Sequence, residues 1–299
     1  MKKVLSILMV LAMMCTSMAF VGCSSTVEGQ SETPSSQGND VSAENAGDSS
    51  ETANKELSGD LTLNGSTSMA KVCQALGEAF MEKYPDVTVT KSGNGSGDAP
   101  KAVTAGTALI GDLSRNMKDE EDPDQFEINQ IAIDGIAIAV NKENPVTELT
   151  SEQIAKIFTG EITNWKDVGG NDQTITVIGR EAASGTRDGF EAIFGREGTC
   201  KHAAEVTSTG EVVSKVGSDP SAIGYVSLDS VNDSVTACKV DGVEATEENI
   251  INGSYKAQRP FIQIYKKGSD SELVKAWFDC SPMKDSRLSP MWGLYRHNK

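Results

Sequence analysis

Residues 179–187 read Gly-Arg-Glu-Ala-Ala-Ser-Gly-Thr-Arg, so an arginine stands four residues ahead of a hydroxyl–glycine–hydroxyl turn. The strand-like run Ile175–Ile178 leads into this stretch, and an amphipathic segment that carries Phe190 and Phe194 follows it. A helix that starts at such a turn presents unpaired backbone N–H groups and the positive end of its peptide dipoles. Arg180 adds a planar fork of donors. The stretch therefore predicts a strand, a turn and a helix that bind a small oxyanion.

Two corners earlier in the chain have a similar composition. Gly65-Ser66-Thr67-Ser68 lies between the strand-like Leu61–Leu63 and a segment from Met69 to Phe80 whose apolar residues have helical spacing. Gly93-Asn94-Gly95-Ser96-Gly97 lies between another strand-like run and a predicted helix over residues 98–104. Clusters of glycine and serine usually mark ordinary loops, so one such corner alone is weak support. Three of them can converge on one ligand.

The start of the chain is typical of an export signal. Two lysines precede an apolar run from Val4 to Phe20, and small residues then lead to a cysteine. Val21-Gly22-Cys23 resembles the lipobox at which bacterial lipoproteins are cleaved and acylated, although Phe20 stands where the pattern usually has leucine. We predict a lipoprotein signal peptide at 1–22, lipidation of Cys23 and a lipid anchor on the extracytoplasmic face of the cell membrane. Cleavage by ordinary signal peptidase and free secretion is the alternative.

Residues 23–56 are rich in serine, threonine and acidic residues and have almost no large apolar side chain. Such a segment cannot bury enough surface to offset the entropy of ordering, so we predict a disordered tether. Between Ser24 and Asp60, eight acidic residues and one lysine account for seven of the sixteen net negative charges. The remaining domain is also acidic, which argues against nucleic acid as a partner because a basic face is required. Local dipoles and arginines can still bind an anion.

The cysteines and histidines are few and scattered. Those that follow Cys23 are Cys73, Cys200, Cys238, Cys280, His202 and His297. Because no close Cys-x-x-Cys pair occurs among them, we expect no metal site, and nothing in the sequence calls for a cofactor. Export permits disulfides, so Cys200 and Cys238 either pair or remain buried free thiols.

Strand and helix signals alternate along the folded part. We predict a strand at Ile131–Val140, a helix at Ser151–Phe158 with Thr150 and Gln153 as a capping box, and a buried strand at Ala222–Val226. This alternation predicts an α/β architecture. About 240 residues follow the tether, which is enough chain for two lobes.

Seven separated motifs occur in the order found in the phosphate-binding proteins of ABC importers. They are Gly65-Ser66-Thr67-Ser68, Gly95-Ser96-Gly97, Ile110-Gly111 with Ser114-Arg115, Asp134-Gly135-Ile136-Ala137, Ile157-Phe158-Thr159-Gly160 with Asn164-Trp165, Arg180 with Ser184-Gly185-Thr186-Arg187, and Ala222-Ile223-Gly224-Tyr225. The chain resembles this family from about Leu57 to about Lys267. The resemblance implies a type II periplasmic-binding-protein fold, in which two α/β lobes joined by hinge strands close over the ligand. It implies lobe 1 at 57–140, lobe 2 at 141–258 and a return to lobe 1 at 259–299.

The resemblance also places the family's phosphate contacts on residues of this chain. They fall on Thr67 and Ser68 in the first corner, on Ser96 in the second, and on Arg180, Ser184, Gly185 and Thr186 in the third. Ser184 and Thr186 could alternatively do no more than cap a helix. We expect Trp165 to be a core residue and Arg187 to brace its lobe through a salt bridge.

One position departs from the family pattern. Some members have an aspartate where this chain has Ser114. The aspartate accepts a hydrogen bond from protonated phosphate and so rejects sulfate, which has no proton at neutral pH. Ser114 could accept weakly, or Asp134 could supply the carboxylate while pairing with Arg115. We therefore include Ser114, Arg115 and Asp134 among the predicted phosphate-binding residues, with Arg115 alternatively a buried partner of an acid.

The sequence changes character from Cys280 onward, and the resemblance stops before residues 281–299. A neighbouring reading frame allows family-like strings, Asp-Glu-Gly and Val-Gly-Leu-Ile-Pro, in this region. We therefore predict a frameshift, in the gene or in its sequencing.

Together these features predict a monomeric solute-binding protein that captures inorganic phosphate and delivers it to the permease and ATPase subunits of an ABC importer. A receptor for sulfate, molybdate or another oxyanion is the alternative, and an adhesive or signalling lipoprotein with the same fold is a third class. We expect no catalysis. The stretch ending at Thr186 lacks the lysine of a phosphate loop, because Gly185 stands there, and Asn94 replaces the first glycine of a Gly-x-Ser-x-Gly motif around Ser96.

Overall fold

The computed structural model describes residues 57–269 and 271–280. The predicted signal peptide, Cys23, the tether and the atypical tail at 281–299 lie outside these residues. Within the described ranges, no helix combines the length and the apolar character that crossing a membrane requires.

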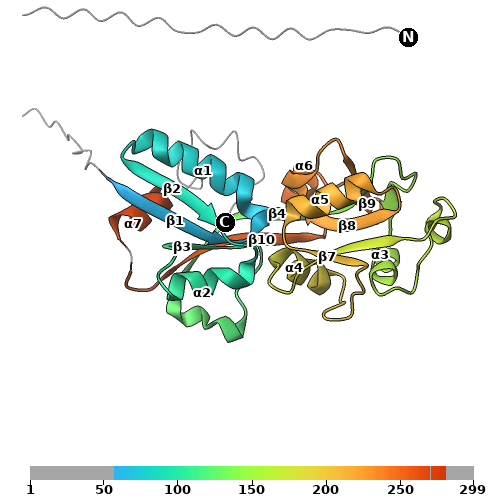
Figure 1. The fold of residues 1–299 in the computed structure, drawn as a ribbon, viewed down its shortest axis with the longest axis horizontal. Coiled ribbons are helices and arrows are strands. Elements are labelled where there is room, and N and C mark those ends of the chain that lie inside the picture. Colours follow the sequence, from blue (N-terminus) through green and yellow to red (C-terminus); the bar gives the residue numbers. More distant parts are fainter. Residues whose placement is uncertain (1–56, 270, 281–299) are drawn as a thin grey trace, which may run out of the picture. The chain divides into compact units, whose positions relative to one another are not determined.

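Lobe 1 is built on a mixed sheet in the strand order β2-β1-β3-β10-β4 (Figure 1). Its strands are β1 (Gly59–Gly65), β2 (Val87–Ser92), β3 (Ile110–Leu113), β10 (Gln258–Lys266) and the first part of β4 (Phe126–Asn141). β1 pairs in parallel with β2 and β3, whereas β10 runs antiparallel to both β3 and β4.

Helices cover both faces of the lobe 1 sheet. Helix α1 (Ala70–Lys83) buries Val72, Leu76 and Phe80, which recur every four residues and so share one face. They pack with Trp277 of α7 (Glu272–Asp279) against the alternating buried residues of β1. Helix α2 (Ala99–Thr104) packs on the other side of the sheet. The apolar periodicities of these segments thus account for the layers seen in Figure 1.

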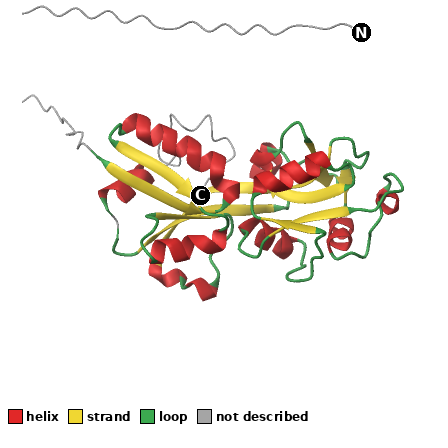
Figure 2. Cartoon of the chain, viewed as in Figure 1, coloured by secondary structure: helices red, strands yellow, loops and turns green. Residues whose placement is uncertain are grey.

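Lobe 2 repeats the layered plan with its own sheet. Its strands are the second part of β4, β5 (Glu148–Leu149), β6 (Thr176–Arg180), β7 (Ala204–Val206), β8 (Ala222–Ser227) and β9 (Val235–Val240). β8, β6 and β7 are parallel neighbours, and β4 runs antiparallel to β8 and β9. The helices are α3 (Ser151–Phe158), α4 (Gly185–Ile193), α5 (Thr209–Ser218) and α6 (Glu247–Ile251). α3 and α4 share one apolar core, and α5 belongs to another. Figure 2 shows helices on both sides of the strands in this lobe.

Strands β4 and β10 join the lobes. β4 pairs with β10 up to Gly135, and from Ile136 onward it pairs with β8. The structure thus has the predicted fold class, two α/β lobes connected by shared strands. The ladder of β4 changes partners between Gly135 and Ile136, whereas the sequence suggested a division at residue 140; the domain boundaries remain a prediction.

Local structure at Thr150, at Trp165 and at the cysteines bears on three sequence predictions. Thr150 and Gln153 form the predicted capping box, because each side chain accepts a hydrogen bond from the other residue's backbone N–H. Trp165 is a core residue, and its Nε1 donates to the carbonyl of Ser221 at 2.9 Å. Cys73, Cys200, Cys238 and Cys280 are all free thiols, so the disulfide alternative for Cys200 and Cys238 does not apply.

Replacement of Trp165 by alanine tests its core role. We expect Trp165→Ala to lower the free energy of unfolding by about 3–5 kcal/mol, because it removes a large buried ring and leaves a cavity. Ile128→Ala is the control, since Ile128 is 46% exposed on β4 and its truncation should cost less than about 0.5 kcal/mol. Urea denaturation followed by circular dichroism gives both values, and equal midpoints for the two variants would contradict the assignment.

Candidate functional site

Helix starts from both lobes meet at one place. In lobe 1, the short helix η1 (Thr67–Met69) leads into α1, and η2 (Ser96–Asp98) leads into α2. In lobe 2, α4 begins at Gly185 and α5 at Thr209. A helix start leaves backbone N–H groups without intrahelical partners and carries a partial positive charge. The arrangement therefore favours a bound anion.

Hydroxyl groups join the first corner to lobe 2. Ser68 Oγ lies 2.6 Å from Thr186 Oγ1 and 3.0 Å from Thr209 Oγ1. Thr67 Oγ1 lies 3.2 Å from Thr209 Oγ1 and accepts the backbone N–H of Thr209. The structure thus brings the predicted residues Thr67, Ser68 and Thr186 together, and adds Thr209.

A second hydroxyl cluster belongs to lobe 1. Ser114 Oγ accepts hydrogen bonds from Ser66 Oγ at 2.8 Å and from Arg259 Nη1 at 3.2 Å. These two bonds fill both lone pairs of the Ser114 oxygen, so its own proton remains to be donated. Ser96 Oγ, 3.3 Å away, already accepts the backbone N–H of Ser114. Ser114 therefore accepts two hydrogen bonds within this cluster and has only its own proton to offer to a further partner.

Gly185 links the third corner to this serine cluster. A Cβ atom at Gly185 would lie 2.1 Å from Ser96 Oγ and 2.7 Å from Ser114 Oγ, far inside van der Waals contact. Only glycine allows the start of α4 to approach the two serines so closely. The neighbouring Ala183 carbonyl also accepts the N–H of Gly97 at 3.0 Å. The three predicted corners are therefore contiguous.

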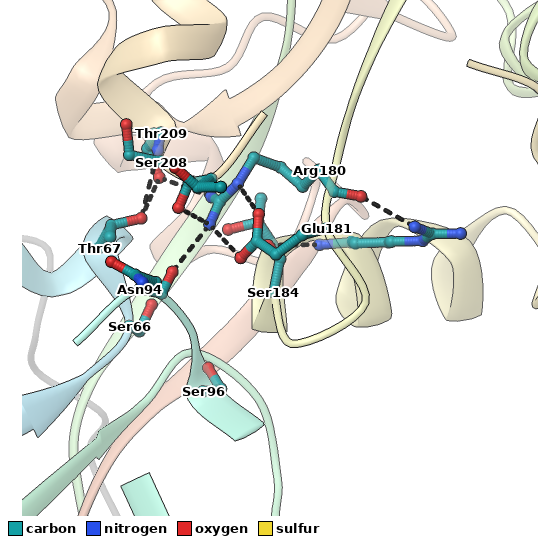
Figure 3. A network of polar contacts seen from close by, with 12 residues as sticks. Ser66, Thr67, Asn94, Ser96, Arg180, Glu181, Ser184, Ser208 and Thr209 are labelled. Carbon is teal, nitrogen blue, oxygen red and sulfur yellow. Dashed lines mark hydrogen bonds and ion pairs between the residues drawn. The ribbon is translucent and has the colours of Figure 1, made fainter. Parts of the chain in front are cut away.

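The guanidinium of Arg180 lies among these loops, with 1% of the residue exposed (Figure 3). Its Nε and Nη2 donate to the Glu181 carboxylate at 3.0 and 2.9 Å. Nη2 also donates to the carbonyl of Asn94 in lobe 1, and Nη1 donates to Thr209 Oγ1, each at 3.1 Å. Arg180 thus connects the second corner with the start of α5.

Asp134 and Arg259 form a buried ion pair where β4 and β10 connect the two lobes. They stand opposite each other in the antiparallel ladder of β4 and β10. Arg259 Nε and Nη2 donate to Asp134 Oδ2 at 3.0 and 2.8 Å, and Ser227 Oγ donates to Oδ1 at 2.7 Å. Burial raises the pKa of Asp134 to about 6, against the lowering effect of Arg259. Asp134 therefore pairs with Arg259, and the predicted pairing with Arg115 is wrong.

Arg115 makes a different set of contacts. Its Nη1 and Nη2 donate to the Glu121 carboxylate at 2.8 and 2.7 Å, and its Nε donates to Asp188 of α4 at 2.7 Å. These carboxylates hold the pKa of Arg115 above its usual value although burial lowers it. In this structure Arg115 is a partner of acids from both lobes.

The remaining predicted residues lie at the start of α4. Ser184 Oγ accepts the backbone N–H of Arg187 at 3.3 Å, which is a helix cap. Arg187 donates to Glu191 at 2.8 Å and to Glu205 at 2.9 Å, so its predicted bracing role is confirmed.

Sequence reasoning missed three residues of this arrangement: Ser66, Thr209 and Arg259. Thr209 had a usable signal, because Ser208-Thr209-Gly210 has the hydroxyl–glycine composition of the other corners. No sequence pattern pointed to Arg259 except that it is a charged residue in an apolar strand. Only the strand register places it beside Ser114.

Comparison with known proteins agrees with this geometry. The family model described as a PBP superfamily domain matches residues 40–279. The phosphate-binding protein PstS of Bacillus subtilis is 34% identical over 239 residues, covering 79% of each chain. PstS of Pseudomonas aeruginosa is 31% identical over 240 residues, with 70% of this chain and 72% of the relative covered.

Solved structures give the same result. A substrate-binding protein from Clostridium perfringens with bound phosphate has a TM-score of 0.76 and 40% identity, with 80% of this chain and all of the other covered. An ABC-type phosphate transport receptor from Vibrio cholerae has a TM-score of 0.64 and 35% identity over 79% of this chain. The chain belongs to the PBP superfamily and, within it, to the PstS family of phosphate-binding proteins.

Proposed function

We propose that this protein is a receptor that captures inorganic phosphate between its lobes and delivers it to an ABC importer. One observation carries the proposal: hydroxyl-rich helix starts of both lobes converge on one point beside the guanidinium of Arg180. Phosphate relatives with the same fold support the choice of ligand.

The donors in the cluster suit a tetrahedral oxyanion. They come from several directions: Thr67, Ser68 and Ser96 of lobe 1, and Arg180, Gly185 and Thr186 of lobe 2. We propose that these residues bind phosphate, together with Ser114 and Thr209. A closed site with fixed donors discriminates because a mismatched ligand leaves a buried polar group unpaired.

Two predicted residues take supporting roles in this proposal. Ser184 caps α4 and thereby orients the N–H groups of the turn. Arg115 bridges Glu121 and Asp188, which stabilises contact between the lobes. We propose that neither needs to contact the ligand through its side chain.

We propose that the ligand leaves unchanged. The hydroxyl groups of Ser66, Ser96 and Ser114 bond to one another and to Arg259, so none has the imidazole or carboxylate partner that would activate it as a nucleophile. Transport relatives support this role. We further propose that the protein is a monomer held at the extracytoplasmic face of the membrane by acylated Cys23.

Arg180→Ala tests the ligand site. We expect phosphate affinity to fall at least about 100-fold, because charge-assisted hydrogen bonds to the anion are lost and Glu181 loses its ion-pair partner. Lys142→Ala removes one positive charge at an exposed position and should bind like the wild type. Isothermal titration calorimetry with phosphate, sulfate and arsenate measures this, and wild-type affinity in Arg180→Ala would refute the assigned role.

Gly185→Ala tests the close approach of the lobes. The added methyl group overlaps Ser96 Oγ, and overpacking of this kind costs about 1–3 kcal/mol, which corresponds to a loss of about ten- to hundredfold in phosphate affinity. Gly210→Ala is the control, because a methyl group there meets open space. Equal affinities in the two variants would show that the α4 turn does not approach the serines when phosphate binds.

Asp134→Asn tests selectivity. The sequence predicted Ser114 or Asp134 as the acceptor of the phosphate proton. Because Ser114 has only its own proton left to offer, Asp134 is the remaining candidate acceptor. We expect the preference for phosphate over sulfate to fall by about tenfold or more, which is the effect of one lost hydrogen bond to a charged group. Competition between the two anions gives the preference in wild type and variant. An unchanged preference would remove Asp134 from this role.

A further inference from the structure

A cluster of metal-ligand residue types lies in lobe 2, apart from the hydroxyl cluster. It consists of Glu191 near the end of α4, and of Cys200 and His202 in the loop between α4 and β7. One ligand atom from each of the three lies within 4.8 Å of the others. The proposed phosphate-binding role uses none of these side chains.

His202 is held in a fixed orientation. Its side chain is 2% exposed, and its Nδ1 lies 3.0 Å from Glu205 Oε1. The ring packs against the backbone of Gly179, where a Cβ atom would fall 2.3 Å from the ring. The other nitrogen, Nε2, is buried and has no hydrogen-bond partner among the described residues. A buried nitrogen without a partner is costly, and it calls for a ligand.

Glu191 and Cys200 have room for a further bond. Glu191 Oε1 accepts from Arg187 Nε and Oε2 accepts from the Gly198 N–H, each at 2.8 Å. Each carboxylate oxygen therefore retains a second lone pair. Cys200 Sγ makes a long contact, 3.9 Å, to the carbonyl of Arg196, and it also interacts with the Glu191 carboxylate.

We propose that Glu191, Cys200 and His202 bind a divalent transition metal of the zinc class, with His202 Nε2 as the imidazole ligand. A thiolate, an imidazole and a carboxylate are all ligands that Zn²⁺ accepts, and a mixed set of this kind disfavours Mg²⁺ and Ca²⁺. The thiol releases its proton to solvent when the metal binds, because the thiolate is the ligand.

Glu205 completes the arrangement. A metal-bound histidine usually donates its second ring N–H to a carboxylate, which fixes the tautomer and the ring orientation. Glu205 holds Nδ1 in this way, and Arg187 bridges Glu205 and Glu191. A metal here would tie the loop after α4 to the helix whose first turn carries Gly185.

The first test is titration of the purified protein with Zn²⁺ and, separately, with Co²⁺. We expect one equivalent of either metal to bind, and bound Co²⁺ to show the near-ultraviolet charge-transfer absorption of a thiolate ligand. Cys200→Ser should abolish this absorption, and Cys200→Ser and His202→Gln should each weaken Zn²⁺ binding at least about tenfold. Cys280→Ser is the matched control, because Cys280 lies near Lys83 in lobe 1 and should leave both signals intact.

Two results would overturn the proposal: wild-type protein whose Co²⁺ spectrum lacks the thiolate absorption, or Zn²⁺ binding that is equal in Cys200→Ser and wild type. Phosphate titration of the same variants serves as a check of folding. Because the metal test uses the wild-type spectrum and no phosphate, its outcome is independent of the proposed transport function.

Discussion

Burial of the Arg180 guanidinium constrains the whole site. A charge removed from water is stable only where its hydrogen bonds are satisfied. Glu181 neutralises Arg180 from its own loop, and the remaining bonds of Nη1 and Nη2 go to Asn94 of lobe 1, to the Thr207 carbonyl and to Thr209 of α5. The loops must therefore meet around this side chain, and their glycine and hydroxyl residues follow from that requirement. Bulky side chains would keep the helix starts apart.

The crossing strands make this meeting geometrically possible. β4 belongs to the sheets of both lobes and changes its pairing partner between Gly135 and Ile136, which is the arrangement of strands that a hinge between lobes requires. At the same point Asp134 and Arg259 face each other across the ladder, and Arg259 also donates to Ser114. The connection between the lobes and the hydroxyl cluster is therefore one continuous set of contacts.

The parts of this structure that local sequence controls could be predicted, and the parts set by strand register could not. The capping box at Thr150 and the turn at Ser184 depend on residues within one helical turn, so their patterns are visible in the sequence. The α/β class followed from the alternation of strand and helix signals, and the type II fold followed from the resemblance to phosphate-binding proteins. Asp134 and Arg259 are 125 residues apart, and no local pattern shows that β4 and β10 place them together. Glu191 and His202 are close in sequence, but they come together through the course of the loop after α4, which no local pattern specifies.

The most direct test of the central claim is a crystal structure of the protein grown with phosphate. We predict one anion between the lobes, with its oxygens within about 3.2 Å of Arg180 Nη1, of the hydroxyls of Ser68 and Thr186, and of backbone N–H groups at the start of α4. A phosphate bound elsewhere, or an Arg180 guanidinium directed away from the anion, would contradict the account.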